Sequence, residues 1–193
     1  MTAPISERWK RIEPLIREDL QKAGIDLVPR NLAEILAKIH TGETNDGKGV
    51  FLIGTPGTGK SRRMKWAADA FEIQFEDASE LCDRLANARF DDEKAEVLNC
   101  NPPHWSEFPQ HWNDMIIDDV GTEPDRQNVF GTVRNLMVDA IVKRHKLFPR
   151  AKTHFTSNLT KDEIRARYGE RVWSRLNEMV TFVTLAGKDR RMN

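Results

Sequence analysis

The chain has 193 residues, 30 acidic and 30 basic side chains, and 39% apolar residues. This length fits one domain of ordinary size with a modest extension, and the apolar content excludes an intrinsically disordered chain. The two cysteines, Cys82 and Cys100, have no paired spacing, and the first residues lack the apolar segment of a signal peptide. We therefore expect a reduced, soluble, cytoplasmic protein with no membrane-spanning run.

Charge is distributed unevenly along the chain. Residues 72–125 hold 15 acidic side chains against 3 basic ones, whereas residues 131–193 hold 6 against 14. An acidic face on one subunit that meets a basic face on the next would give a head-to-tail oligomer. Two solvated surfaces, or pairing within one subunit, would give the same pattern.

Two short helices with apolar stripes are expected before residue 42, and a polar, glycine-containing linker follows them. Residues 1–45 are therefore predicted to form an N-terminal helical extension and linker. Residues 46–193 are predicted to form the core domain.

The stretch GVFLIGTPGTGKS, residues 49–61, has the pattern of a P-loop: an apolar strand, a glycine-rich turn and a helix start. Glycines let the backbone N–H groups wrap phosphate oxygens, and the helix directs its positive dipole end at them. Lys60 adds a cation for the β- and γ-phosphates, and Ser61 offers a hydroxyl to Mg²⁺. The expected ligand is a nucleoside triphosphate. The residues predicted to bind it are Gly54, Thr55, Pro56, Gly57, Thr58, Gly59, Lys60, Ser61 and Arg62.

A helix is predicted over 62–70, a strand over 71–75 and a helix over 78–88. Residues 101–114, NPPHWSEFPQHWND, cannot form a regular element because they are rich in proline. Their aromatic side chains would pack against the sheet, stack on bases or anchor a partner. Cys100, His104 and His111 match no standard zinc spacing.

The apolar run 115–117 ends in Asp118 and Asp119, the arrangement called Walker B. Its first carboxylate holds Mg²⁺ and its second orients or deprotonates the attacking water. We assign the metal site to Ser61 and Asp118, and the base to Asp119. Two aspartates after a strand are weak evidence for a nucleotide site by themselves. Downstream of a P-loop they are stronger evidence for the Walker B arrangement.

The remaining pattern predicts a helix over 130–147, a strand over 153–157, a helix over 162–179 and a strand over 180–186. Strands that alternate with helices indicate an α/β fold with a parallel sheet, whose ligands bind at the carboxyl ends of the strands. Gly54, Asp118 and Asn158 would all lie on that edge.

Four stretches, GTPGTGKS, IIDDVGTEP, KTHFTSNLT and RYGERVWSRLNEM, resemble in order and spacing the AAA+ ATPases of the DnaC/IstB-like group of helicase loaders and transposition helper ATPases. The resemblance covers residues 48–191. It implies a P-loop NTPase core of the AAA+ (ASCE) type with a five-stranded parallel sheet in the order 5-1-4-3-2. It also implies that the C-terminal lid domain of many AAA+ proteins is absent.

The resemblance also implies roles for individual residues. Asp118 and Asp119 match the paired acids of this group, and Asn158 matches sensor 1, which places water against the γ-phosphate. Arg175, in the SRL of the last long helix, matches the arginine finger given to the neighbouring subunit. Arg171 is a second candidate for the interface. The implied catalytic set is Lys60, Asp119, Asn158 and Arg175.

The function that the resemblance implies is Mg²⁺-dependent ATP hydrolysis by a head-to-tail oligomer acting in DNA replication, through helicase loading, or in transposition. The implied partners are further copies of the chain, single-stranded or duplex DNA, and a client such as a replicative helicase or a transposase. Two alternatives stay open. One is a P-loop kinase for a small molecule, and the other is a nucleotide-gated scaffold with little hydrolysis, which the short side chain of Asp119 permits.

Overall fold

The computed structural model describes residues 48–100 and 113–185. The predicted N-terminal helices, the domain boundary at residue 45, most of the loop 101–114 and the predicted lack of a lid fall outside the described residues. The elements are β1 (Gly49–Ile53), α3 (Lys60–Phe71), β2 (Gln74–Asp77), α4 (Ala78–Asn87), α5 (Asp91–Val97), β3 (Met115–Asp118), β4 (Gln127–Val129), β5 (Thr132–Arg134), α6 (Leu136–His145), β6 (Thr153–Ser157), α7 (Lys161–Tyr168), α8 (Glu170–Met179) and β7 (Val180–Thr184).

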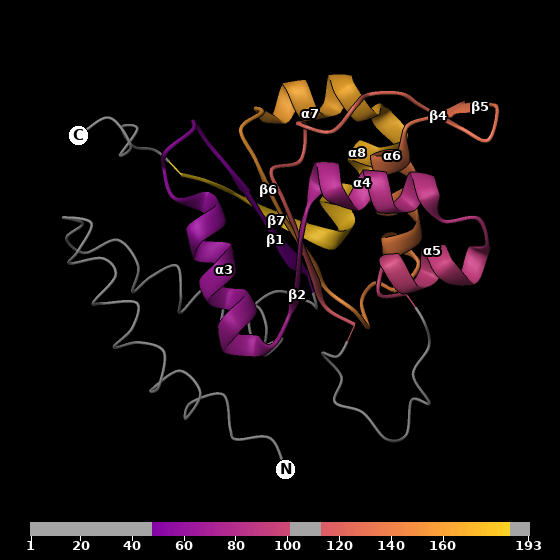
Figure 1. The fold of residues 1–193 in the computed structure, drawn as a ribbon. Coiled ribbons are helices and arrows are strands. Elements are labelled where there is room, and N and C mark those ends of the chain that lie inside the picture. Colours follow the sequence, from indigo (N-terminus) through magenta and orange to yellow (C-terminus); the bar gives the residue numbers. More distant parts are fainter. Residues whose placement is uncertain (1–47, 101–112, 186–193) are drawn as a thin grey trace, which may run out of the picture.

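Five strands form one parallel sheet in the order β2-β3-β6-β1-β7. Read from the β7 edge, and with the separate β4–β5 hairpin left out of the count, this is the predicted order 5-1-4-3-2. Successive strands are joined by helices, so their carboxyl ends lie at one edge of the sheet (Figure 1). The P-loop, the two aspartates and Asn158 follow β1, β3 and β6 at this edge.

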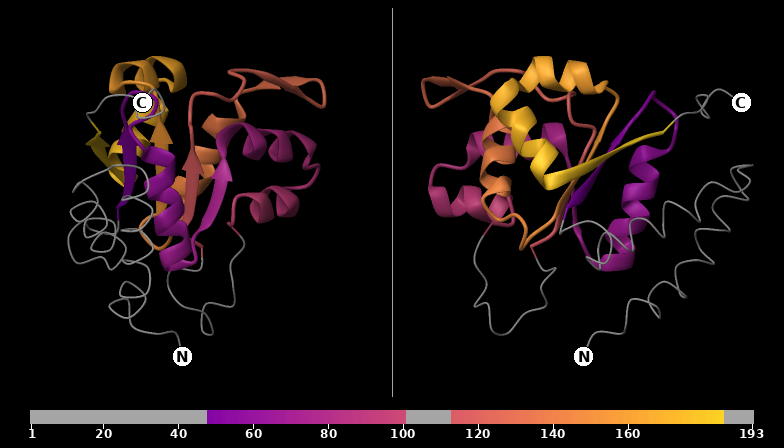
Figure 2. Two further views of the ribbon diagram at one scale, coloured as in Figure 1. Left: turned by 60° about the vertical axis from the view of Figure 1, so that its left-hand side comes forward. Right: turned by 180° about the vertical axis from the view of Figure 1, so that it is seen from behind.

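The two faces of the sheet bury alternate residues of the same strands, as the two-residue period of a strand requires. In β1, Val50 and Leu52 pack on α3, whereas Phe51 and Ile53 face the larger core formed with α4, α6, α7 and α8. Figure 2 shows α3 on one side of the sheet and the other helices on the opposite side. A parallel sheet covered on both faces is buried, which explains why β1, β3 and β6 are apolar or uncharged almost throughout.

Two predicted boundaries are wrong near glycine or cap positions. The helix predicted over 162–179 is two helices, because Gly169 takes a φ of +80° and ends α7. The helix predicted from residue 130 begins only at Leu136, where the Asn135 side chain accepts a hydrogen bond from the N–H of Val138 at 3.0 Å. Residues before this cap form the β4–β5 hairpin, which projects from the α4–α6 side of the molecule (Figure 1).

A third prediction, a strand over 71–75, is displaced. Phe71 completes the buried face of α3, and Glu72 closes that helix in the left-handed region with a φ of +55°. The strand β2 therefore starts only at Gln74. The short helix α5 had not been predicted. No helix in the described part of the chain is long and apolar enough to cross a membrane.

Arg144, in the last turn of α6, is fully buried and joins four segments at the amino edge of the sheet. It donates to Thr153 Oγ1 (2.9 Å) and to the main-chain carbonyl oxygens of Leu98 (3.1 Å), Asn99 (3.1 Å), Asn113 (2.7 Å) and Lys152 (2.8 Å). A planar guanidinium with five N–H donors suits this role better than any other side chain. Arg144 thus fixes both ends of the segment that connects α5 to β3.

The neighbouring Asp114 gives the fold a pH-dependent stability. Burial raises the pKa of this carboxyl to about 6, although the N–H of Lys152, 2.7 Å from Oδ1, opposes the shift. A pKa above the unfolded value means that the neutral form favours folding, so this group lowers the free energy of unfolding as pH rises from about 4 to about 6.

We expect Asp114→Asn to be more stable relative to wild type at pH 7.5 than at pH 4, by on the order of 1–3 kcal/mol. The amide oxygen still accepts the Lys152 hydrogen bond, while the buried charge is gone. Urea unfolding at both pH values measures the difference. The same difference in stability between variant and wild type at both pH values would show that Asp114 has an ordinary pKa.

Candidate active site

The loop 54–59 connects β1 to α3, which begins at Lys60, as the sequence predicts. Gly54 has a φ of +154°, and a Cβ there would lie 2.4 Å from the carbonyl oxygen of Leu185. Gly59 caps α3 in the left-handed region with a φ of +82°. The Thr58 hydroxyl closes the turn by donating to Thr55 O at 2.9 Å. The described backbone therefore places the amino end of α3 beside the loop, where an anion is favoured.

Lys60 is 5% exposed, and its ammonium group lies within the loop. Nζ donates to the carbonyl oxygens of Gly54 at 2.8 Å and Thr55 at 3.0 Å, and to Asn158 Oδ1 at 2.6 Å. These are acceptors that phosphate oxygens can replace, because a charge-assisted bond to an anion is stronger than one to a neutral carbonyl.

The two arginines that open α3 have different surroundings. Arg62, predicted to be part of the phosphate-binding set, is exposed, and its guanidinium lies 5.6 Å from the ring centre of Trp66. Arg63 is buried and donates from Nη1 to Thr58 O at 2.6 Å. Arg63 therefore supports the loop from within the protein. This role could not be predicted from the sequence, because a basic run on a helix is usually solvated.

Asp118 and Asp119 end β3 and share one partner, Thr156 of β6. The Thr156 hydroxyl donates to Asp118 Oδ1 at 2.5 Å and accepts from the N–H of Asp119 at 2.8 Å. Asp118 is 8% exposed, while Asp119 has a φ of +60°, which is rare for residues other than glycine, asparagine and aspartate. Thr156 had not been predicted to belong to the site.

Asn158 joins the lysine to the second aspartate. Its Nδ2 donates to Asp119 Oδ1 at 2.8 Å, and its Oδ1 accepts from Lys60 Nζ at 2.6 Å. A cation, an amide and a carboxylate from the segments that follow three adjacent strands, β1, β6 and β3, thus form one hydrogen-bonded row, the Lys60–Asn158–Asp119 row. Such a row offers a phosphate ligand, a group that orients water and a base within a few ångströms.

The predicted metal ligands are Ser61, half-buried as the second residue of α3, and Asp118 at the end of β3. Hydroxyl and carboxylate oxygens are the hard ligands that Mg²⁺ prefers, and Mg²⁺ keeps several waters and substrate phosphates in its shell. In the described residues, no group of three or more histidines, cysteines or acids could hold a metal by itself. The donors present fit Mg²⁺ bound together with a phosphate. Of the weak zinc candidates, His104 and His111 lie outside the described residues.

Arg175 lies on α8, away from this row. Its Nη1 donates to the carbonyl oxygen of Arg171 at 2.9 Å, one turn earlier on the same helix. Just beyond it, Asn177 O accepts from Lys48 Nζ at 3.0 Å, so this part of α8 lies beside the amino end of β1. The P-loop follows the carboxyl end of β1, about 16 Å away for a five-residue strand.

The acidic residues that could hold Arg175 in a local ion pair have other partners. Glu170 pairs with Arg165 at 2.6 Å, and Glu178 pairs with His145 at 2.8 Å. In the described structure Arg175 is half-buried on α8, and Arg171, one turn earlier, is exposed. It does not bring Arg175 to the P-loop of its own chain.

Glu123 is a buried carboxylate that the sequence analysis missed. Its side chain is 0% exposed and accepts hydrogen bonds from Gly121 and from two residues of α7. Together with burial, which is the larger effect, it raises the pKa of the nearby Cys82 thiol to about 12. Its place in the stretch IIDDVGTEP, four residues after Asp119, was the available signal.

Comparison with solved structures shows what this fold is similar to. The DnaC helicase loader matches with a TM-score of 0.57 and 22% identity over 83% of this chain and 92% of that one. A putative primosome component from Streptococcus pyogenes serotype M3 matches with a TM-score of 0.56 and 20% identity, over 84% and 82% of the two chains. AMPPCP-bound DnaA from Aquifex aeolicus matches with a TM-score of 0.51 and 14% identity, over 86% and 50%.

These neighbours are AAA+ proteins. The chain has the AAA+ fold. No protein-family model matches the sequence, and no curated protein matches it either. At these identities the likeness concerns the AAA+ fold alone. The assignment of the site rests on the geometry above.

Proposed function

We propose that this chain binds ATP with Mg²⁺ at the P-loop and hydrolyses it as an accessory ATPase of DNA replication, in a head-to-tail oligomer. The observation that carries the proposal is the Lys60–Asn158–Asp119 row, which joins the P-loop cation to the carboxylate after β3. The titles of structural neighbours, a helicase loader and a DNA replication initiation factor, support the replication role.

Each residue of the site has a part in the proposed reaction. Lys60 exchanges the carbonyl oxygens of Gly54 and Thr55 for β- and γ-phosphate oxygens. Ser61 and Asp118 would hold Mg²⁺, which would neutralise charge that develops on the phosphates. Asn158, released from Lys60, orients the attacking water, and Asp119 takes its proton.

The first experiment compares Lys60→Ala with Asp119→Asn. Loss of the cation should weaken ATP binding on the order of 10- to 100-fold, because a charge-assisted bond contributes about 1.5–3 kcal/mol. Asp119→Asn should bind ATP normally and lose 10²- to 10⁴-fold in turnover, since an amide cannot accept the proton. Asparagine tolerates the positive φ at this position and keeps the acceptor for Asn158.

Fluorescent ATP-analogue binding and phosphate release measure the two effects. Normal affinity in a folded Lys60→Ala protein would contradict the P-loop assignment. ATP-dependent assembly without phosphate release in wild type would favour the nucleotide-gated scaffold, and transfer of the phosphoryl group to a small molecule would favour the kinase.

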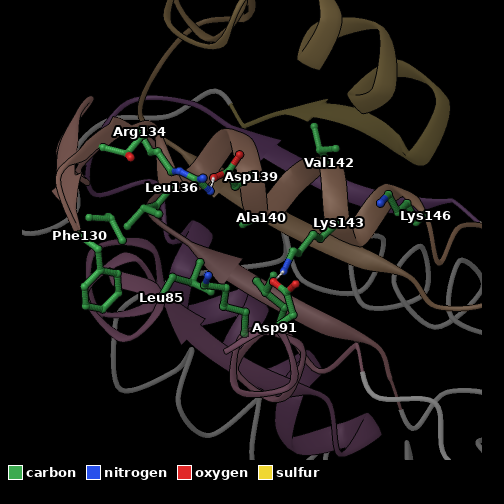
Figure 3. A pocket seen from close by; sticks show the side chains of 14 residues that line it. Leu85, Asp91, Phe130, Arg134, Leu136, Asp139, Ala140, Val142, Lys143 and Lys146 are labelled. Atoms are coloured by element: carbon green, nitrogen blue, oxygen red, sulfur yellow. Dashed lines mark ion pairs between the residues drawn. The ribbon is translucent and has the colours of Figure 1, made fainter. Parts of the chain in front are cut away.

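We also propose that DNA binds along a groove between α4, α5, α6 and the β4–β5 hairpin. This cavity of about 380 Å³ is lined by the cations Lys94, Arg134, Lys143 and Lys146. Phe130, at the tip of the hairpin, is 66% exposed at one end of the groove, and Lys146 lies at the other (Figure 3). Asp139 and Asp91 pair with two of the cations, at 3.7 and 3.8 Å. Exposed aromatic rings beside cations suit a single strand, whose bases stack and whose phosphates attract charge.

Phe130→Ala is expected to weaken single-stranded DNA binding about 10-fold, because base stacking on an aromatic ring contributes about 1–3 kcal/mol. Phe90→Ala is the matched control, since Phe90 is 64% exposed and does not line the groove. Fluorescence anisotropy over a range of salt concentrations measures both. An equal loss in the two variants, or an affinity independent of salt, would argue against this surface.

A further inference from the structure

Glu123 uses both of its carboxylate oxygens. Oε2 accepts from the N–H of Gly121 at 2.7 Å. Oε1 accepts from the Tyr168 hydroxyl at 2.6 Å and lies 3.3 Å from Nη2 of Arg167. The same Nη2 also donates to the main-chain oxygen of Glu123. These hydrogen bonds fix the buried Glu123 side chain in one position. Removing one partner of such a buried pair destabilises a protein more than the intact pair stabilises it.

The short loop between Asp119 and Glu123 is a compact turn, which we call the Asp119 loop (residues 119–123). The carbonyl oxygen of Asp119 accepts from both the N–H and the hydroxyl of Thr122, at 3.2 and 2.8 Å. Gly121 has a φ of +107°, and a Cβ there would lie 2.6 Å from Leu159. The end of β6 therefore confines one side of the loop. Glu123 holds the other side.

Asp119 depends on this support. Its positive φ is one that aspartate adopts more readily than most residues, and the contacts of the loop keep the backbone in it. If the loop relaxed, the carboxylate would leave Asn158, and the Lys60–Asn158–Asp119 row would break. A base displaced by about 1 Å can lose 10²-fold in rate.

The anchor on the other side is the end of α7. Arg167 and Tyr168 are adjacent residues, and the guanidinium of the first lies 5.7 Å from the ring centre of the second. Gly169 follows and leads directly into α8, the helix that carries Arg175. The contact thus ties the Asp119 loop to the helix pair α7–α8.

We propose that Glu123 is a positioning residue for Asp119, which holds the Asp119 loop in its hydrolytic shape by anchoring it to Arg167 and Tyr168. The proposal rests on the proposed ATP hydrolysis, in which Glu123 touches neither nucleotide nor water. Its removal therefore affects the chemical step and leaves the P-loop intact.

The test compares Glu123→Ala and Glu123→Gln with Ile164→Val, a mutation that removes one methylene from the buried face of α7 and leaves the hydrogen bonds of Glu123 in place. Glu123→Ala should lower kcat for ATP hydrolysis about 10²-fold, with KM and the affinity for an ATP analogue changed less than about twofold. Glu123→Gln keeps the side-chain volume and an acceptor for Gly121, and its kcat should fall about 10-fold. Ile164→Val should keep kcat, although its melting temperature falls.

A second measurement needs no turnover. Amide hydrogen exchange over residues 119–122 should be faster in both Glu123 variants and unchanged in Ile164→Val. Normal kcat in folded Glu123→Gln and Glu123→Ala, or a fall in kcat matched by Ile164→Val at equal loss of stability, overturns the positioning role. If wild type does not hydrolyse ATP, the proposed function fails, and unchanged exchange in the Glu123 variants overturns the anchor as well.

Discussion

Arg175→Ala should bind ATP as wild type does and lose about 10³- to 10⁵-fold in hydrolysis. The Lys60–Asn158–Asp119 row supplies a cation and a base from one chain, but charge that develops on the γ-phosphoryl oxygens needs a further cation, and an arginine from a neighbouring subunit contributes an effect of this size. Arg175 lies near the opposite end of β1 from its own P-loop, as the Lys48–Asn177 contact shows. It is therefore suited to act on a neighbouring subunit.

Mixing provides the decisive control. Arg175→Ala mixed with Lys60→Ala should recover part of the activity, because some interfaces then join an intact P-loop to an intact arginine. Arg165→Ala is the matched single variant, since this arginine is exposed on α7 and pairs with Glu170; it should lose little. Wild-type turnover by Arg175→Ala, under conditions in which wild type assembles, would show that hydrolysis needs no arginine from α8.

Arg144→Met should lower the free energy of unfolding by about 3–5 kcal/mol. The change removes the shared donor of four main-chain carbonyl oxygens at the amino edge of the sheet, although Lys152 O keeps the N–H of Met115 at 3.1 Å. Each buried acceptor that is left unsatisfied costs about 1–3 kcal/mol. Arg144→Lys should lose less stability than Arg144→Met, because lysine keeps the positive charge. Some loss should remain, because lysine lacks the planar guanidinium.

Urea unfolding measures this loss. Lys143→Ala, on the same helix, is the control; its pair with Asp91 at 3.8 Å is partly exposed and contributes at most about 1 kcal/mol. The P-loop lies at the other edge of the sheet, so any Arg144 variant that folds should keep its affinity for ATP. A loss below 1 kcal/mol in Arg144→Met would mean that water replaces the guanidinium.

The sequence alone predicted the parallel α/β sheet, its strand order through the resemblance, and the placement of the P-loop, Asp118, Asp119 and Asn158 at one edge. These features depend on local rules. Glycines permit the turn, a lysine and a serine follow at fixed spacing, and a buried strand ends in acids. Parallel strands joined by helices then bring their carboxyl ends together whatever the rest of the chain contains.

Local patterns were insufficient where one residue overrides the periodicity. The apolar spacing from residue 130 fitted a helix, but the Asn135 cap starts α6 later and leaves Phe130 on an exposed hairpin. Gly169 likewise divides an apparently continuous helix. A single cap or a single positive φ decides these boundaries, and its effect depends on the tertiary position of the chain on either side.

Only the tertiary structure revealed Arg63, Glu123, Arg144 and Thr156 as supports of the fold and the site. The sequence predicts Arg63 to be a surface charge and Thr156 to be an ordinary strand residue. The partners of Thr156, and the partners of Glu123 on α7, lie 37 to 45 residues away along the chain. The sequence thus determined which functional groups the chain has at the predicted site, because these groups lie in short motifs. The tertiary structure decided which buried polar groups hold it in place, because hydrogen bonds between distant segments form only once the sheet has assembled.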